Sequence, residues 1–592
     1  MYFTLAICAA TPEACAALTG AADRTHPRVM PIPGPARVAW RAPGGRAAVL
    51  HWGEAPSPGT SHAGTIWAEG GTVYARTGLA RVDPVYRTEV AGAVVVSDRA
   101  CWAAAVTGRM GDPDPAMAGA FLSLGYPVGD ATPFRGVRAL GGDRELRLID
   151  GRLIDGRLID GRLDDRRAGG RQAGGRQAGG RQAGGGRMGV VRARAEDGGP
   201  AGAEAVAEAL TEAVRPLGGD SPVELSLTGG KDSRLVAAAL AAARVPFRAR
   251  THGFAGHPDV VVAGLIAATL GVEHIVTRPR PPGAPDEAYV LGRLRATVLV
   301  SDGMLSAFEN LGSGFRPDPQ AASGPAEAGG HGGELLRGGY AQAAWRTRAA
   351  PGSVAAPLNA AAAAELFRRM TMRRLSLLRP GPAWAYLASL APPAVALARR
   401  PLAALDDFYL ANRAGRWSSA ARQAYLLRSP LIQPLFADRV VRAARAVPLR
   451  DRMSDRLHRD VLGLLCPELL GLPLAGTPWH GEPRTAATVL TVPPGAAADW
   501  RRDYGDVVAG FLRGYVLDHG QASPVFSIVR RSAAERLLRA PQADRQGAWA
   551  LATLTALLSG DWLNARKPAA EAVSRGRTWS RPARSTGRPR RG

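Results

Sequence analysis

The first 150 residues contain short apolar or alternating runs that are broken by Gly, Pro and Asp. Examples are ARVAW around Val38, AAVLHWG from Ala47 and AGAVVVSD from Ala91. Alternation with a period of two is typical of strands that bury one face. Residues 1–150 are therefore predicted to form a β-rich domain with few helices, such as one over 116–124.

After residue 200 the pattern changes to alternating strands and helices. A helical pattern over 201–214 precedes the β-rich run 223–227, and an Ala/Leu/Val-rich helical segment follows that run. FRARTHG then predicts a strand, and HPDVVVAGLIAATLGVEHIV predicts a helix and a strand. This alternation predicts an α/β fold with a parallel sheet and with ligands at the carboxyl ends of its strands. Residues 355–470 are rich in Ala, Leu and Arg and are predicted to be mostly helical.

Two segments are predicted to lack a packed structure. Residues 151–200 hold repeats of LIDGR and then of AGGRQ, whose five-residue period is too short for a stacked repeat unit. We interpret them as a flexible linker without a catalytic role, and residues 566–592 as a disordered basic tail. The domains are thus a β-rich domain at 1–150, the linker, an α/β domain with a helical C-terminal part at 201–565, and the tail.

The charge and composition exclude several classes of protein. The net charge is +24, but half of it comes from the repeats and the tail, and no base-reading motif appears, so no specific nucleic-acid binding is predicted. No apolar run reaches the length of a membrane span, and the start has no basic signal-peptide region. The four scattered cysteines form no CxxC pair and suit a reducing cytoplasm, where we expect the protein.

The turn between strand 223–227 and the next helix holds the most specific motif. Its residues are Thr228, Gly229, Gly230, Lys231, Asp232 and Ser233. The glycines let backbone N–H groups approach an anion, and the helix N-terminus adds a partial positive charge. Lys231 adds a cation, and Asp232 a carboxylate that can hold Mg²⁺ or simply cap the helix. The spacing is neither a Walker nor a dinucleotide motif, and TGGKDS resembles the [ST]GGxDS loop of ATP pyrophosphatases, which adenylate a substrate.

Three further segments resemble the asparagine synthetase family. SGPAEAGGHGGELLRGGY (Ser323–Tyr340) is similar to that family's SGEGSDEVFGGY segment. Tyr425–Met453 is similar to its R-x-P-F-L-D helix region, and Gly129–Leu140 to the end of its N-terminal domain. The resemblance covers most of residues 1–480 apart from the repeats. It implies a PP-loop synthetase domain preceded by an Ntn-hydrolase-like glutaminase domain, with ATP and Mg²⁺ as cofactors.

The resemblance also assigns roles within the second motif. Glu334 occupies the place of the family's Mg²⁺-binding aspartate, so Asp232 and Glu334 are the implied metal ligands. His331 stands where β-lactam synthetases have the Tyr that deprotonates the attacking amine, and a pKa near 6.5 suits that task. We therefore predict His331 and Lys231 as catalytic residues. A histidine in a glycine loop can also bind a backbone group or a phosphate.

Two departures from the family matter for function. The family's glutaminase nucleophile is a cysteine that follows Met1, but position 2 is Tyr2, whose phenol cannot replace a thiol, so a degenerate glutaminase is predicted. The family's late lysine, expected within 473–482, has no counterpart, and Arg484 is the substitute candidate.

These features predict an ATP-dependent ligase that forms amide bonds without hydrolysing glutamine. A carboxylate attacks the α-phosphate of ATP, pyrophosphate leaves, and an amine captures the acyl-adenylate. The favoured use is lactam or macrolactam formation in peptide natural-product biosynthesis, as in lasso-peptide cyclases, with a precursor peptide as substrate and peptide-processing proteins as partners. The alternatives are an ammonia-dependent asparagine synthetase and a non-catalytic homologue that binds a nucleotide or a partner.

Overall fold

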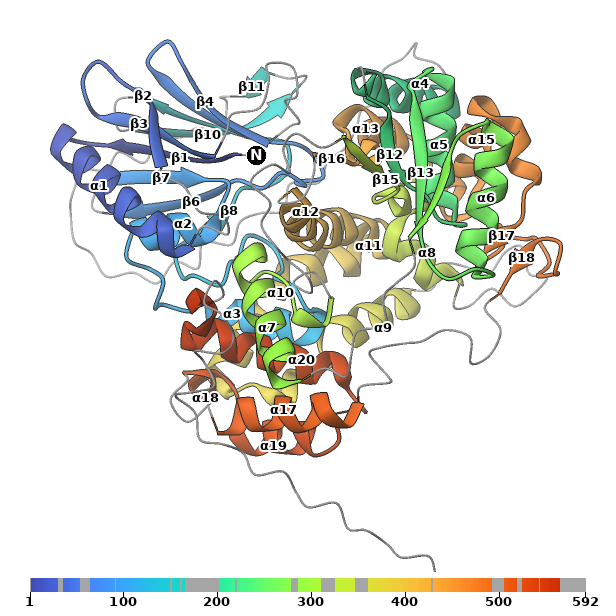
Figure 1. Ribbon diagram of the computed structural model, residues 1–592. Helices are drawn as coiled ribbons and strands as arrows, with labels where there is room; N and C mark the ends of the chain where they lie inside the picture. Colours follow the sequence, from blue (N-terminus) through green and yellow to red (C-terminus); the bar gives the residue numbers. More distant parts are fainter. Residues whose placement is uncertain are drawn as a thin grey trace, which may run out of the picture.

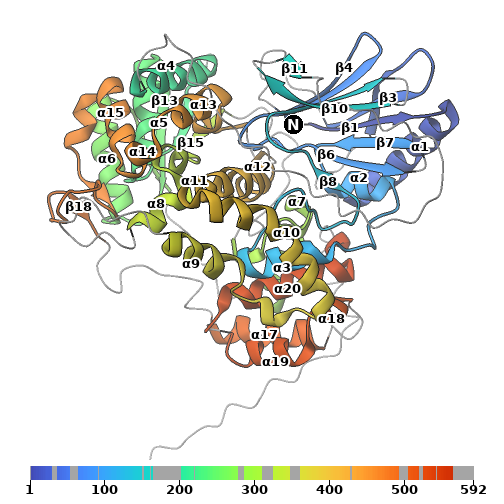
Figure 2. The ribbon, with the colours of Figure 1, turned by 180° about the vertical axis from the view of Figure 1, so that it is seen from behind.

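The protein is described by a computed structural model (Figure 1). It describes residues 2–29, 36–53, 64–90, 92–149, 152–159, 162–164, 202–218, 221–277, 286–309, 325–346, 360–426, 430–491, 505–518, 524–541 and 543–564. Figures 1 and 2 show a β-rich part, an α/β part beside it, and a helical part below both.

Two antiparallel sheets form the N-terminal part. The first has the order β2 (Ala36–Arg41), β3 (Ala47–Gly53), β1 (Tyr2–Ala9), β7 (Ala93–Ser97), β6 (Tyr86–Val90) and β8 (Arg138–Ala139). The second has the order β11 (Arg162–Asp164), β10 (Arg152–Ile159), β9 (Arg144–Ile149), β5 (Thr72–Thr77) and β4 (Gly64–Glu69). The apolar runs of this part therefore do form strands.

Strand β1 shows how the layers are built. Leu5 and Ile7 belong to the core shared with α1 (Pro12–Val29) and α2 (Ala100–Val106). Ala6 and Cys8 belong instead to the core between the two sheets. The first sheet thus lies between a helical layer and the second sheet, which explains why β1 is apolar on both faces. The 18-residue helix α1 was not among the predicted elements.

The repeat segment differs from the expectation of a linker at its N-terminal end. Strand β10 pairs antiparallel with β9, with Leu153 opposite Leu148. The carboxylate of Asp155 accepts hydrogen bonds from Arg144 Nε at 3.0 Å and from Arg87 Nη1 at 3.1 Å. The cross-strand Leu pair and the hydrogen bonds of Asp155 stabilise this strand, because Leu and Asp alternate in the LIDGR unit. Residues 165–200 of the predicted linker and the whole predicted tail, 566–592, lie outside the described residues.

The α/β part has one parallel sheet, as predicted. Its order is β14 (His274–Thr277), β13 (Phe247–His252), β12 (Val223–Ser226), β15 (Glu327–Gly329) and β16 (Leu431–Ile432). The helices of the repeating units are α4 (Ala203–Val214), α5 (Lys231–Ala242) and α6 (Pro258–Leu270). Helix α5 is buried over most of its length because α4 and α15 (Arg456–Leu465) pack against it.

Helices make up most of the remaining chain, as predicted for 355–470. They are α3 (Pro115–Leu124), α7 (Glu287–Ser301), α8 (Gly339–Arg346), α9 (Ala360–Thr371), α10 (Pro380–Arg399), α11 (Pro401–Phe408), the π-helix η7 (Tyr409–Ser418), α12 (Ser419–Leu426), α13 (Asp438–Ala446), α14 (Leu449–Met453), α17 (Gly505–Leu517), α18 (Val525–Ile528), α19 (Arg531–Arg539) and α20 (Arg545–Ser559). Short 3₁₀ turns are η2 (Arg215–Leu217), η3 (Ala307–Glu309), η5 (Gly333–Arg337), η6 (Leu375–Leu377), η8 (Pro434–Phe436), η9 (Pro467–Gly471) and η11 (Asp561–Asn564). Strands β17 (Leu474–Ala475) and β18 (Val489–Leu490) form a small parallel pair.

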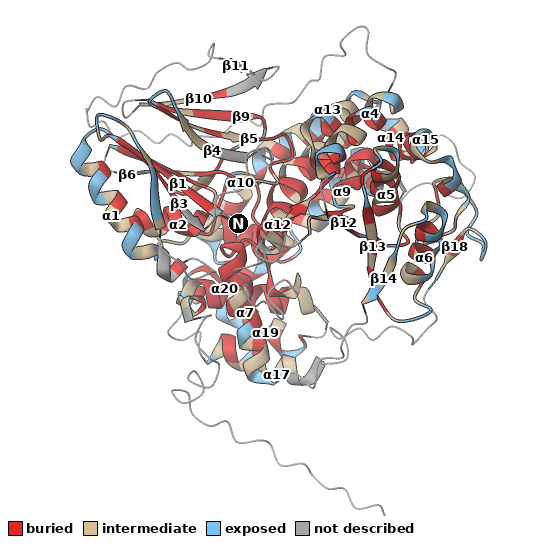
Figure 3. Cartoon of the chain, turned by 45° about the horizontal axis from the view of Figure 1, so that its top comes forward, coloured by how far each residue is buried: buried red, intermediate tan, exposed pale blue. Residues whose placement is uncertain are grey.

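The N-terminal segment and the helical part share one core. Helix α3 packs on α10 and α20, and Gly119 lies so close to the Tyr386 ring that a Cβ there would overlap it. Figure 3 shows α20 and the central strands of the first sheet as mostly buried. At the junction, Asn412 of the π-helix accepts a hydrogen bond from Gly129 N at 2.8 Å. Within the described ranges, none of the helices combines the length and the apolar character that crossing a membrane requires.

Candidate functional site

The TGGKDS loop connects β12 to α5 and is held by its own side chains. Ser233 Oγ accepts a hydrogen bond from Thr228 N at 3.0 Å and lies 3.0 Å from Thr228 Oγ1. Gly230 is the N-cap residue of α5, and no side chain caps this helix end. The N–H groups of the first turn thus have no side-chain cap from Gly230, which suits the anion binding that the motif predicts.

Gly229 is required by close approach to its neighbours. A Cβ on this residue would lie 2.6 Å from Ala475 Cβ and 2.9 Å from Val262 Cβ. The Gly229 N–H donates to Asp259 Oδ1 at 2.9 Å, and its carbonyl accepts from Ala475 N at 2.9 Å. Backbone contacts thus attach the loop both to α6 and to β17.

The second motif lies directly beside the first. Strands β12 and β15 are parallel neighbours with Ser226 opposite Gly329, so the loops that follow them meet at one edge of the sheet. A Cβ on Gly330 would lie 2.5 Å from Ser233 N, and a Cβ on Gly333 would overlap the Asp232 carboxylate. Two motifs about a hundred residues apart in the sequence therefore form one site, and only glycine permits their contact.

Asp232 has one oxygen that is partnered and one that is not. Oδ2 accepts from Arg337 Nη2 at 2.7 Å. Oδ1 is buried and accepts no hydrogen bond, a property that it shares, among the described residues, with only one other buried carboxylate oxygen, Asp98 Oδ1. A buried, unpartnered carboxylate oxygen is costly. Oδ1 therefore fits a cation, and Mg²⁺ commonly takes one or two protein carboxylates together with phosphate oxygens.

Glu334 is the second residue of the 3₁₀ turn η5 and lies near Tyr409 of the π-helix. Burial and then the nearby Glu334 carboxylate raise the pKa of the Tyr409 phenol well above its ordinary value. No group of three or more His, Cys, Asp and Glu side chains that could hold a metal occurs among the described residues. The roles of Asp232 and Glu334 as Mg²⁺ ligands both stay predictions, and only Asp232 Oδ1 shows a buried oxygen without a hydrogen bond.

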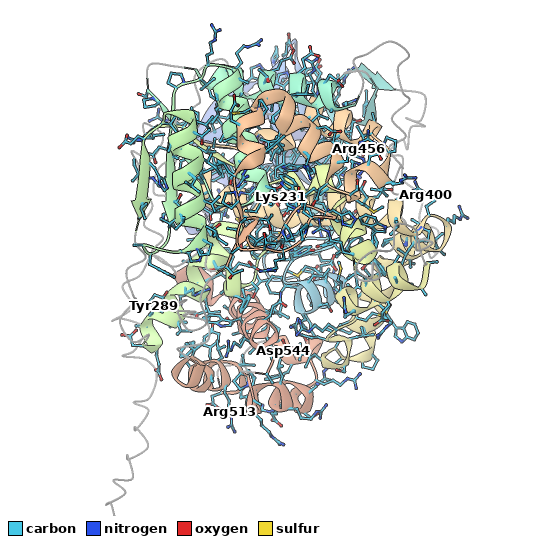
Figure 4. All side chains as sticks on the ribbon, turned by 90° about the vertical axis from the view of Figure 1, so that its right-hand side faces the viewer. Lys231, Tyr289, Arg400, Arg456, Arg513 and Asp544 are labelled. Carbon is cyan, nitrogen blue, oxygen red and sulfur yellow. The ribbon has the colours of Figure 1, made fainter. Side chains whose placement is uncertain are left out.

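Lys231 reaches the segment in which the late lysine was expected. Its Nζ donates to Asp455 Oδ2 at 2.6 Å and to Pro478 O at 2.9 Å, and it lies 4.7 Å from the ring centroid of Trp479. Figure 4 shows Lys231 within the α/β part, far from Asp544 of the helical part. Burial lowers the pKa of Lys231, while Asp455 opposes this change. Arg484, the substitute candidate, has an exposed side chain.

Asp455 joins four segments and was missed by the sequence analysis. Besides Lys231 it accepts from Gln342 Nε2 at 2.7 Å, from Arg346 Nη2 at 2.7 Å and from His480 N at 3.1 Å. Its side chain is fully buried, and its backbone is left-handed with φ 61°. Burial alone would raise the pKa of Asp455, but Lys231 and Arg346 hold it below its ordinary value. No local motif surrounds this residue that could have identified it.

Two histidines lie near the loop in different surroundings. His331 is exposed, and desolvation by the protein atoms around it lowers its pKa, which favours the neutral ring. His458 of α15 is fully buried, with Nε2 3.1 Å from Lys231 O and 3.9 Å from Asp232 Oδ1. Burial and then Arg337 lower the pKa of His458 to about 3, so it stays neutral. His458 was not predicted.

Comparison with known proteins supports the resemblance over part of the chain. The family model described as Asparagine synthase matches residues 205–288, which include the TGGKDS loop and end before the second motif. No curated protein matches the chain. The match supports a synthetase domain of the asparagine synthetase family, which uses ATP, at α4 to β14.

Proposed function

We propose that the protein is an ATP-dependent synthetase that activates a carboxylate as an acyl-adenylate and transfers the acyl group to an amine. The observation that carries this proposal is the meeting of two glycine loops at Asp232, where an uncapped helix N-terminus lies beside an unpartnered carboxylate oxygen. Such an edge of a parallel sheet suits the binding of a nucleoside triphosphate with a divalent cation.

The chain's residues would act in sequence along two steps. A substrate carboxylate oxygen attacks the α-phosphorus of ATP, and the bond to the β-phosphate oxygen breaks to release pyrophosphate. The first-turn N–H groups of α5 bind phosphate oxygens, and Asp232 would hold Mg²⁺, which when bound neutralises phosphate charge. An amine nitrogen then attacks the acyl carbon, AMP leaves, and neutral His331 takes the amine proton.

The N-terminal part is proposed to be a degenerate Ntn-type glutaminase domain. Its cysteines Cys8, Cys15 and Cys101 are all fully buried. Burial raises the pKa values of the Cys15 and Cys101 thiols, which opposes formation of the nucleophilic thiolate. The amine would therefore belong to the substrate or to a second substrate, which favours lactam or macrolactam formation on a precursor peptide delivered by processing proteins.

The test is ATP–pyrophosphate exchange with the purified full chain. Labelled pyrophosphate should enter ATP only when a carboxylate substrate is present, with candidate precursor peptides and aspartate as probes. Exchange with aspartate, followed by asparagine formation from ammonia, would favour an ammonia-dependent asparagine synthetase. Binding of ATP without pyrophosphate exchange in the presence of any carboxylate would favour a non-catalytic homologue. That alternative is compatible with the structure, because Arg337 already occupies one oxygen of Asp232. Glutamine should yield no glutamate above background.

The base role of His331 separates the two steps. His331→Ala should leave carboxylate-dependent exchange intact while amide formation falls about 10²–10⁴-fold. An equal loss of both steps would place His331 in nucleotide binding or loop structure instead.

A further inference from the structure

Arg337 ends the 3₁₀ turn that follows the second glycine loop, and its guanidinium lies at the start of α5. Its Nη2 is 2.7 Å from Asp232 Oδ2, and the two side chains are 17% and 22% exposed. The pair therefore spans the two loops that follow β12 and β15. Solvent reaches both partners in part, so a ligand can reach them as well.

The turn holds Arg337 in a defined place. Gly332 and Gly338 bracket the turn with left-handed backbones, φ 102° and 77°. Between them Leu335 and Leu336 are fully buried, and Leu335 O accepts from Arg452 Nη1 at 2.9 Å. Packing on both sides thus directs the Arg337 side chain towards the TGGKDS loop, rather than leaving it free on the surface.

Two other cations of this region share one buried carboxylate. Lys231 and Arg346 both bond the single carboxylate of Asp455. The guanidinium of Arg337 is hydrogen-bonded to Asp232, and the carboxylates of Glu334 and Asp455 also lie in its electrostatic surroundings. Like Asp232 Oδ1, the Nε of Arg337 is buried and makes no hydrogen bond.

The two unpartnered atoms of this ion pair fit one kind of ligand. Asp232 Oδ1 can accept a cation, and the guanidinium of Arg337 can donate to an oxyanion. A polyphosphate that carries a divalent cation presents both partners together. A guanidinium can hold two phosphate oxygens at once, which suits the β- and γ-phosphates better than a single charged oxygen.

We propose that Arg337 is a nucleotide-binding residue that contacts the β- and γ-phosphates of ATP and neutralises the pyrophosphate as it leaves. The inference rests on the proposed function of the loop as an ATP site. It adds a cation from the second motif to the loop residues that the sequence identified. Asp232 holds the guanidinium in place before the nucleotide arrives.

The experiment compares two nucleotides that differ in these phosphates. Binding of α,β-methylene-ATP with Mg²⁺, and of AMP, is measured by calorimetry for the full chain and its variants. Arg337→Gln should weaken α,β-methylene-ATP by about 10–100-fold and AMP by less than about 3-fold, because AMP lacks the groups that Arg337 contacts. Arg337→Lys should lie between, since it keeps the charge and loses the paired donors.

A matched control is the pair Arg295–Asp561 of the helical part, at 2.6 Å with 10% and 15% exposure. Arg295→Gln should leave both nucleotide affinities unchanged. The fall in its melting temperature measures how much stability the loss of such an ion pair costs, for comparison with Arg337→Gln. Equal weakening of both nucleotides in Arg337→Gln would make Arg337 a loop-positioning residue, and unchanged or tighter ATP binding would also overturn the proposal. If the unaltered chain binds neither nucleotide, both the proposed function and the proposed role of Arg337 are wrong.

Discussion

Two aspartate–arginine ion pairs in this molecule, one fully buried and one partly exposed, have different effects. At the junction of the N-terminal sheet and α7, Arg99 pairs with Asp302, and neither side chain is exposed. Asp302 Oδ2 accepts from Ala100 N at 2.7 Å, and Cys101 Sγ donates to Oδ1 at 2.9 Å. At the glycine loops, Asp232 pairs with Arg337, but Oδ1 has no partner and both side chains are partly exposed.

The difference shows what each pair stabilises. The guanidinium of Arg99 also donates to the carbonyls of Leu299 and Val300, so it ties the end of α7 to the N-terminal part. A carboxylate whose oxygens are both bonded, with its counter-ion enclosed, can stabilise only the fold. The pair at Asp232 keeps a buried oxygen without a hydrogen bond on a side chain that solvent reaches in part, which suits a ligand site.

Asp302→Ala should have the largest effect, and it tests whether the Arg99–Asp302 pair serves the fold alone. Arg99 would then be buried without a counter-charge, and loss of one partner of a buried pair costs about 3–5 kcal/mol. Thermal unfolding should show a large fall in melting temperature, while α,β-methylene-ATP affinity of the folded protein should not change. The control is Glu365→Ala, which removes the exposed Glu365–Arg368 pair of α9. A shift no larger than that control would show that the junction pair does not hold the fold.

Asp232→Asn should have the converse effect. The substitution keeps the size of the side chain and removes its charge, so Mg²⁺ loses its candidate ligand. Pyrophosphate release should fall about 10²-fold, because a bound metal contributes several kcal/mol of charge stabilisation. The melting temperature should fall less than in Asp302→Ala. The direct measurement is the Mg²⁺ dependence of α,β-methylene-ATP binding, which should be strong in the unaltered chain and absent in the variant.

Asp455→Asn tests the charge network that holds Lys231. At neutral pH the loss of these charge-assisted hydrogen bonds should cost about 1.5–3 kcal/mol of unfolding free energy. Burial already lowers the pKa of Lys231 and Asp455 opposes this, so the variant lysine should lose its proton at a lower pH. The alkaline limit of nucleotide binding should therefore move to lower pH. An unchanged alkaline limit would show that Lys231 does not serve as a cation in binding.

The acid side of the same variant gives a second measurement. The folded-state pKa of Asp455 is lowered, so its contribution to stability is present above the ordinary value near 3.9 and is lost as the pH falls through the folded-state pKa. Asp455→Asn should remove this part of the acid-induced loss of stability. Urea unfolding of both proteins between about pH 2 and pH 6 would measure the difference.

Local patterns predicted the parts of the site that depend on local physics. Strand, glycine turn and helix start are adjacent at 223–242, and the alternation of strands and helices correctly predicted the parallel sheet. The partners of Asp455 could not be predicted, because Lys231 lies 224 positions away and Gln342 lies 113 positions away, with no motif at either contact. Arg337 lies inside a recognised motif, but its contact with Asp232 depends on β12 and β15 being neighbours.

A glycine lies beside Asp232 and another beside Asp302. Adding a single methyl group at each is the smallest change that can distinguish the two ion pairs. A Cβ on Gly333 would overlap the Asp232 carboxylate, so Gly333→Ala should displace it and weaken α,β-methylene-ATP binding. Gly303 follows Asp302 with φ +70°, and a Cβ there would lie 2.7 Å from Leu557 Cδ1. Gly303→Ala should therefore cost about 1–2 kcal/mol of stability through backbone strain, with nucleotide binding intact. Calorimetric binding and thermal unfolding of both variants would check this, and a loss of affinity in Gly303→Ala equal to that in Gly333→Ala would show that the junction also controls the nucleotide site.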